Sequence, residues 1–184
     1  LDLYKKGFDV TVVEPALMPD NPNSNRLQRI LAKHASDVIA LPCFAQQLTG
    51  YTHLSSAFDL AFALGPNFQN YANNGLQLVE GVKGILHALK PHGSLVFEID
   101  KGYPISDTAI TIFLNQQKSQ TVRFFKIEEF LHNNGIPFEI EIDETKGTHA
   151  IRIFKSQESF RKLSMIDDSQ ILAYDCEYSV AEYP

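Results

Sequence analysis

The sequence predicts an α/β fold in which a doubly wound, mostly parallel sheet ends in antiparallel strands. Short, almost continuously apolar strands alternate with amphipathic helical stretches over most of the chain. Such alternation is typical of βαβ units, whose parallel strands are covered by helices on both faces. The last third instead carries two consecutive strands separated by a short turn, a pattern that indicates antiparallel pairing.

The first half of the chain contains three predicted parallel strands. Residues Leu1 to Lys6 have the pattern of a helix end, and Gly7 stops that helix because glycine tolerates the left-handed conformation. The strands are "DVTVVE" at 9–14, "DVIAL" at 37–41 and "AFDLAFALG" at 57–65, with the helix "RLQRILAKHA" between the first two. Because these strands are apolar throughout, we expect them to be buried on both faces.

The second half continues the alternation and then changes character. An apolar helical stripe predicts a helix over 74–90, in which Gly81 and Gly84 permit close packing on the sheet. Pro91 ends this helix, and the chain turns at Gly93 into the strand "SLVFEID" at 94–100. The helix "KIEEFLHNNG" and the strands "FEIEID" and "HAIRIF" follow, and the two strands are predicted to close the sheet as an antiparallel pair.

Composition narrows the classes of function. The 184 residues include 16 Lys and Arg against 22 Asp and Glu, a net charge of -6 with no basic run, so we expect no nucleic-acid partner. No apolar stretch approaches the roughly 20 residues that span a bilayer, and we expect no membrane partner. Two distant cysteines fit reduced thiols, and the expected location is cytoplasmic. Of six histidines only His53 and His149 merit testing, neither has a second ligand at metal spacing, and no metal site is expected.

The chain divides into a predicted α/β domain at 1–155 and a C-terminal extension at 156–184, packed on the same domain. The extension is acidic and contains tyrosines. Its apolar and aromatic residues leave three roles open: packing on the domain, covering a site, or forming an oligomer with another subunit.

Glu14 ends the first visible strand and is the first candidate for ligand binding. An acidic residue at such a strand end can accept hydrogen bonds from both hydroxyls of an adenosine ribose. The alternative is that Glu14 only caps the loop that follows.

The order of these segments resembles the class I S-adenosylmethionine (SAM)-dependent methyltransferases. The resemblance rests on "LDLYKKGFDVTVVEPA", "SAFDLAFALGPNF", "GILHALKPHGSLVFEID" and "FFKIEEFLHNNGIPFEIEID" with "THAIRIFK", and it covers most of 1–155. It implies a Rossmann-like fold and SAM as the cofactor. His92 stands where the family often has glycine.

Two departures from the family concern the cofactor site. The family's glycine-rich loop after its first strand is absent, and by the resemblance that strand and loop are expected upstream of Leu1, so that the fold is truncated at its N-terminus. The family's acidic residue after the third strand is also absent from "LPCFAQQL", where Cys43 or Phe44 borders the adenine or simply packs. The resemblance places the cofactor against Glu14, Pro15, Cys43, Phe44, Ala63, Leu64 and Gly65.

The acceptor is expected on the segment that follows the third visible strand. By the resemblance this segment forms the methyl-transfer face, with Phe68, Tyr71 and, from the next strand end, Tyr103 as substrate-binding candidates. Methyl transfer requires alignment of the acceptor and exclusion of water, whereas a catalytic base is optional, so no catalytic residue is assigned.

Three functions fit the sequence. The first is SAM-dependent methyl transfer to a small-molecule acceptor. The second is a catalytically inactive, methyltransferase-like binding or scaffold protein, which the absent glycine loop favours. The third is an NAD(P)-dependent oxidoreductase, because a strand-end acid binds ribose there too; the antiparallel ending of the sheet favours it least.

Overall fold

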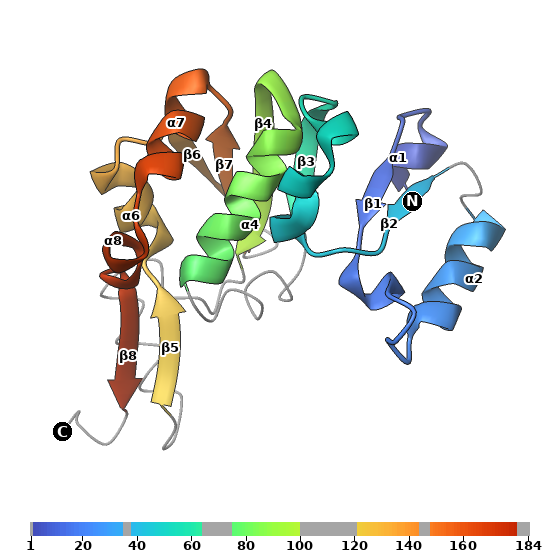
Figure 1. The fold of residues 1–184 in the computed structure, drawn as a ribbon, viewed down its shortest axis with the longest axis horizontal. Coiled ribbons are helices and arrows are strands. Elements are labelled where there is room, and N and C mark those ends of the chain that lie inside the picture. The colour runs from blue at the N-terminus through green and yellow to red at the C-terminus, as the bar shows by residue number, and fades with distance from the viewer. Residues whose placement is uncertain (1, 35–37, 64–74, 100–120, 144–147, 180–184) are drawn as a thin grey trace.

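The computed structural model describes residues 2–34, 38–63, 75–99, 121–143 and 148–179 (Figure 1). Within them the protein is a mixed α/β structure whose strands form one four-stranded sheet and two two-stranded sheets.

A short parallel pair of strands forms the N-terminal part. Helix α1 (Asp2–Lys5) ends at Gly7, whose φ of 84° confirms the predicted left-handed stop. Strand β1 (Thr11–Val13) leads through the 3-10 turn η1 (Pro15–Leu17) and helix α2 (Ser24–His34) to strand β2 (Ile39–Leu41). Strands β1 and β2 pair in parallel, and both are shorter than the sequence predicts.

The four-stranded sheet has the order β3-β4-β7-β6. The 3-10 turns η2 (Ala45–Gly50) and η3 (Thr52–Leu54) precede strand β3 (Phe58–Ala63), which helix α4 (Gly75–Ala88) connects to strand β4 (Leu89–Ile99). Strands β3 and β4 are parallel, whereas strands β6 (Phe138–Asp143) and β7 (Thr148–Phe154) are antiparallel to their neighbours. The sheet is therefore mixed: β3 and β4 are parallel, and the predicted antiparallel pair of strands closes it.

The remaining elements lie at the other side of the sheet from β1 and β2 (Figure 1). Helix α6 (Ile127–Asn133) was predicted, and its stop at Gly135 is confirmed by a φ of 60°. Strands β5 (Thr121–Phe125) and β8 (Asp175–Ser179) form an antiparallel ribbon, and helices α7 (Gln157–Met165) and α8 (Asp168–Leu172) precede β8. The sequence analysis did not predict this ribbon or these two helices.

The hydrophobic core lies between α4 and one face of the sheet. Leu89 and Leu95 of β4 and Ile153 of β7 have no exposed surface, and they pack with Leu86 of α4. Leu163 of α7 and Ile171 of α8 are also fully buried in this cluster. Residues beyond 155 therefore contribute to the main core, while the division of the chain at 155 stays a prediction.

The expectation that the parallel strands are buried on both faces is wrong for β2 and β3. Ile39 is 60% exposed, and Leu60 and Phe62 are 43% and 46% exposed. In β3 the residues Ala61 and Ala63 pack toward the core, so Leu60 and Phe62 belong to the opposite face. Apolar composition predicted burial, but exposure depends on which segments cover a face.

The turn predicted at Pro91 to Gly93 lies inside β4, because α4 ends at Ala88 and β4 already begins at Leu89; the prediction that Pro91 ends the helix is therefore wrong. The left-handed residue is His92, with a φ of 67°, rather than Gly93. The turn is held by paired backbone bonds, since His92 donates to the carbonyl of Lys155 at 3.2 Å and Lys155 donates to that of Gly93 at 2.8 Å. A left-handed conformation at a residue with a Cβ atom is strained, which fits the glycine that the family often has there.

Within the part of the chain that the structure describes, no helix combines the length and the apolarity that crossing a bilayer requires.

A close contact between α4 and η2 depends on glycine. A Cβ atom at Gly84 would overlap the carbonyl oxygen of Ala45 and lie 2.9 Å from its carbonyl carbon. The neighbouring atoms belong to the backbone, so they cannot rotate away. Gly84 therefore permits close packing, but against the backbone of η2 and not on the sheet as predicted.

We expect Gly84→Ala to destabilise the protein by about 1–3 kcal/mol, the usual cost of overpacking. Alanine gains about 1 kcal/mol of helix propensity, so a net loss would show that the contact dominates. Urea unfolding followed by circular dichroism measures the difference. The matched control is Gly50→Ala, whose Cβ atom meets nothing within 4 Å. Equal stability of the two variants would contradict the prediction.

Candidate functional site

The carbonyl group of Leu41 brings together two predicted cofactor residues at the carboxyl ends of β1 and β2. It accepts hydrogen bonds from the backbone N–H of Glu14 at 3.1 Å and from that of Cys43 at 2.9 Å. The segments that follow β1 and β2 are therefore bonded to the same carbonyl oxygen at the point where they leave the sheet. In a parallel sheet, the carboxyl ends of the strands form the edge where ligands bind.

One oxygen of the Glu14 carboxylate accepts a hydrogen bond, and the other accepts none from the described residues. Its Oε1 atom accepts from the backbone N–H of Ala16 at 2.9 Å and so caps η1, whose first residue is Pro15. Among the described residues, no hydrogen bond reaches its Oε2 atom, and the side chain is half-buried. The capping alternative is thus observed, and it orients the carboxylate while leaving one oxygen to accept from a ligand hydroxyl.

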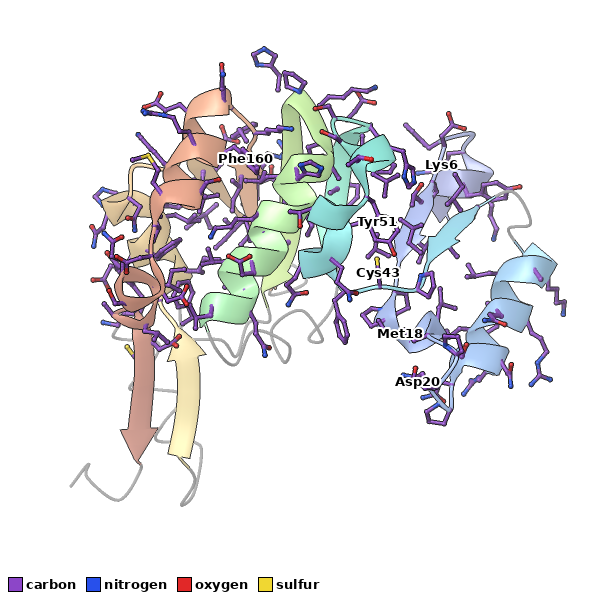
Figure 2. The ribbon with its side chains drawn as sticks, viewed as in Figure 1. Lys6, Met18, Asp20, Cys43, Tyr51 and Phe160 are labelled. Carbon is purple, nitrogen blue, oxygen red and sulfur yellow. The ribbon has the colours of Figure 1, made fainter. Side chains whose placement is uncertain are left out.

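Cys43 is buried at this edge and interacts with Tyr51 (Figure 2). Burial raises the pKa of the Cys43 thiol above its ordinary value, and the hydrogen bond with Tyr51 opposes part of that rise. The pKa of Tyr51 is also raised, mainly because the charge of a Cys43 thiolate would repel a phenolate. Both groups are therefore neutral near pH 7, and the buried thiol of Cys43 packs beside Tyr51.

Phe44 begins η2 next to this pair. Its backbone N–H donates to the Oε1 atom of Gln47 at 2.8 Å, which closes the turn. Cys43 forms a small core with Leu48 and Leu54, against which Val13 and Tyr51 pack. The apolar surroundings suit the flat face of an aromatic base, and they serve equally to join β1 and β2 to α4.

Of the other predicted site residues, one lies in the four-stranded sheet and the rest lie outside the residues that the structure describes. Ala63 ends β3 opposite Phe97 of β4 and is half-buried. Leu64, Gly65, Phe68, Tyr71 and Tyr103 lie outside the described residues. The structure therefore brings together Glu14, Pro15, Cys43 and Phe44, whereas Ala63 belongs to the four-stranded sheet.

The strand ends share one edge of the molecule. Figure 1 shows β1, β2, β3 and β4 running toward its lower side, so Glu14, Cys43 and Ala63 follow strands that point the same way. A shallow depression of about 250 Å³ lies beside η1, lined by Leu17, Gln28, Leu31, Ala40 and Pro42. Its lining is mostly apolar and contains no carboxylate.

Tyr51 is the residue that the sequence analysis missed. It lies between two 3-10 turns, and its ring centroid is 5.9 Å from that of His53, in an edge-on arrangement. No sequence pattern marks it, because its partner Cys43 is brought near by the intervening turn rather than by a regular period. Among the described residues, no group of three His, Cys, Asp or Glu side chains is arranged to hold a metal ion.

No family model matches the chain, and the comparison with curated proteins found no match. Solved structures do match. A SAM-dependent methyltransferase from Methanosarcina mazei is 17% identical, with 84% of this chain and 85% of that chain covered and a TM-score of 0.53. A protein from Pyrococcus horikoshii OT3 is 16% identical, with 84% and 74% covered and a TM-score of 0.57.

Two further solved structures also match this chain. A 16S rRNA adenine methyltransferase from Catenulisporales acidiphilia, solved with its cosubstrate SAM, is 13% identical, with 84% and 77% covered and a TM-score of 0.50. A chain from Bordetella parapertussis, named as a possible exported protein, is 15% identical, with a TM-score of 0.47. The match covers 80% of this chain but only 62% of the Bordetella chain. The chain has the Rossmann-like fold of SAM-dependent methyltransferases.

We expect Cys43 to react with a maleimide at pH 8 at least about tenfold more slowly than Cys176, because a buried thiol reacts only through local opening. Cys176 is half-buried. Intact-mass spectrometry of Cys43→Ser and Cys176→Ser variants separates the two rates. Rapid labelling of Cys43 in the folded protein would contradict its place in the small core.

Proposed function

We propose that this chain is the domain of an enzyme that transfers a methyl group from SAM to a small-molecule acceptor. The observation that carries the proposal is the oriented carboxylate of Glu14 at the carboxyl end of β1, in a chain with a methyltransferase fold. One oxygen accepts from Ala16, and the other accepts no hydrogen bond within the part of the chain that the structure describes. Each carboxylate oxygen can accept two hydrogen bonds, so the two hydroxyls of a ribose diol could both bind Glu14 while Oε1 also accepts from Ala16.

The residues at this edge fit an adenosyl group. Glu14 would accept from the ribose hydroxyls, while Cys43 and Phe44 would border the base through apolar and backbone contacts. When bound, SAM supplies an electrophilic methyl carbon on its sulfonium ion. The protein would align the acceptor and exclude water, and the acceptor proton would leave to solvent or to a base that is not assigned here.

The acceptor class is the finer part of the proposal. The net charge of -6 disfavours a polyanionic substrate, because each contact with phosphate is normally made by a cation. The rRNA methyltransferase with the same fold acts on nucleic acid, which makes RNA the competing acceptor to test. Small-molecule methylation is the acceptor class that the charge supports.

We expect S-adenosylhomocysteine (SAH) to bind in isothermal titration calorimetry, measured on this chain and on the complete product of its gene. Glu14→Ala should weaken binding about tenfold or more, since a hydrogen bond to a charged group is worth about 1.5–3 kcal/mol. Glu14→Gln keeps an acceptor for Ala16 and should lose less. Asp20→Asn is the matched control, an exposed side chain that changes the net charge equally.

Three outcomes would overturn parts of this proposal. Binding of NADH but not of SAH would favour the oxidoreductase. Absence of binding to either ligand by both forms of the protein would favour a scaffold without catalysis. Transfer of a radioactive methyl group from SAM to purified RNA, rather than to a low-molecular-weight cell extract, would contradict the small-molecule acceptor while preserving the cofactor.

A further inference from the structure

The beginning of α4 is held by a residue from the far end of the chain. The backbone N–H of Gly75 donates to the Oδ1 atom of Asp175 at 2.9 Å, and the two residues are 100 positions apart. The first N–H groups of a helix have no partner within the helix. Asp175 supplies one, and its negative charge also lies at the positive end of the helix dipole.

The contact is close enough to require glycine. A Cβ atom at Gly75 would overlap the ring of Phe125 and lie 2.9 Å from the Oδ1 atom of Asp175. Gly75 is buried, and Phe125 is 1% exposed. The start of α4 therefore presses directly against the β5–β8 ribbon.

The ribbon itself is firmly anchored. Phe125 stands opposite Asp175 in the antiparallel register, and the N–H of Lys126 donates to the carbonyl of Tyr174 at 3.0 Å. The ring of Phe125 packs on that of Phe130 with centroids 5.2 Å apart and on that of Tyr174 at 6.3 Å. Such packing makes this part of the ribbon a rigid support for the helix.

The supported end of α4 faces the edge of the sheet where the candidate site lies. The other end of α4 is beside the beginning of β3, because Ala57 donates to the carbonyl of Ala88 at 2.9 Å. A helix that connects two parallel strands runs back along them, so Gly75 lies toward the carboxyl ends of β3 and β4. Figure 1 shows this end of α4 at the lower edge, toward which β1 and β2 also run, although β1 and β2 lie on the opposite side of the four-stranded sheet from the β5–β8 ribbon.

We propose that Asp175 is a positioning residue for cofactor binding: it fixes the start of α4, and thereby the carboxyl edge of the sheet, from the C-terminal ribbon. This inference rests on the proposed function. Asp175 binds the backbone N–H of Gly75 and acts on the edge of the sheet through α4. If Asp175 has this role, loss of its carboxylate weakens ligand binding at the carboxyl edge of the sheet more than it lowers the stability of the hydrophobic core.

The test compares Asp175→Ala and Asp175→Asn with Asp167→Ala. Asparagine keeps an oxygen that accepts from Gly75, whereas alanine removes it. Asp167 caps α8, accepting from Gln170 N at 2.9 Å, so its replacement removes an equal charge and a similar helix cap from the same C-terminal segment. Amide hydrogen exchange reports on Gly75, calorimetry with SAH reports on the site, and thermal unfolding reports on the core.

We expect exchange at Gly75 to accelerate about two- to thirtyfold in Asp175→Ala, the range given by loss of a helix cap. Asp175→Asn should restore most of the protection. The dissociation constant of SAH should rise about threefold or more in Asp175→Ala and stay unchanged in Asp167→Ala, even when the two variants melt at the same temperature.

The outcomes separate this inference from the proposed function. Unchanged exchange at Gly75 in Asp175→Ala would show that the contact does not hold the helix. Faster exchange with unchanged SAH affinity, or equal loss of affinity in Asp167→Ala, would leave only a structural cap. Failure of the wild-type protein to bind SAH would contradict the proposed function and the positioning role together, and the exchange result would still decide whether Asp175 holds α4.

Discussion

The molecule depends on the burial of one face of β4 beneath α4. Leu89 and Leu95 are fully buried there, and each such side chain contributes about 1.5–3 kcal/mol to folding. Among the described residues, β4 and β7 are the strands with hydrogen-bonded neighbours on both sides. The same helix contacts η2 through Gly84 and the C-terminal ribbon through Gly75. The buried interface of α4 therefore connects η2, the turn that follows Cys43, to β8, the last described strand.

The sequence predicts well those elements whose pattern is local. Alternation of apolar and acidic residues identifies β6, and an apolar stripe between two breakers identifies α4. The β5–β8 ribbon joins segments far apart in the chain, so neither strand carries a local signal for its partner. Exposure of Leu60 and Phe62 is missed for a related reason: composition describes a side chain, whereas burial depends on which other segment covers it.

The candidate site is predictable in outline and not in detail. Glu14 and Cys43 follow two parallel strands, so chain order alone places them at one edge. Their common bond to the Leu41 carbonyl and the capping of η1 by Glu14 depend on how the backbone turns after each strand. Sequence reasoning treats capping and ligand binding by Glu14 as alternatives. The two oxygens of a carboxylate allow one side chain to do both.

The unpaired edge of β3 has a consequence for the behaviour of the protein at high concentration. Among the described residues β3 bonds to β4 alone, and its far side presents free backbone groups beside the exposed rings and methyl groups of Phe62 and Leu60. Such an edge is a template for strand addition and hence for aggregation. Long-range repulsion from the net charge of -6 opposes that encounter, and salt screens it. Colloidal stability is therefore a property of ionic strength as much as of the fold.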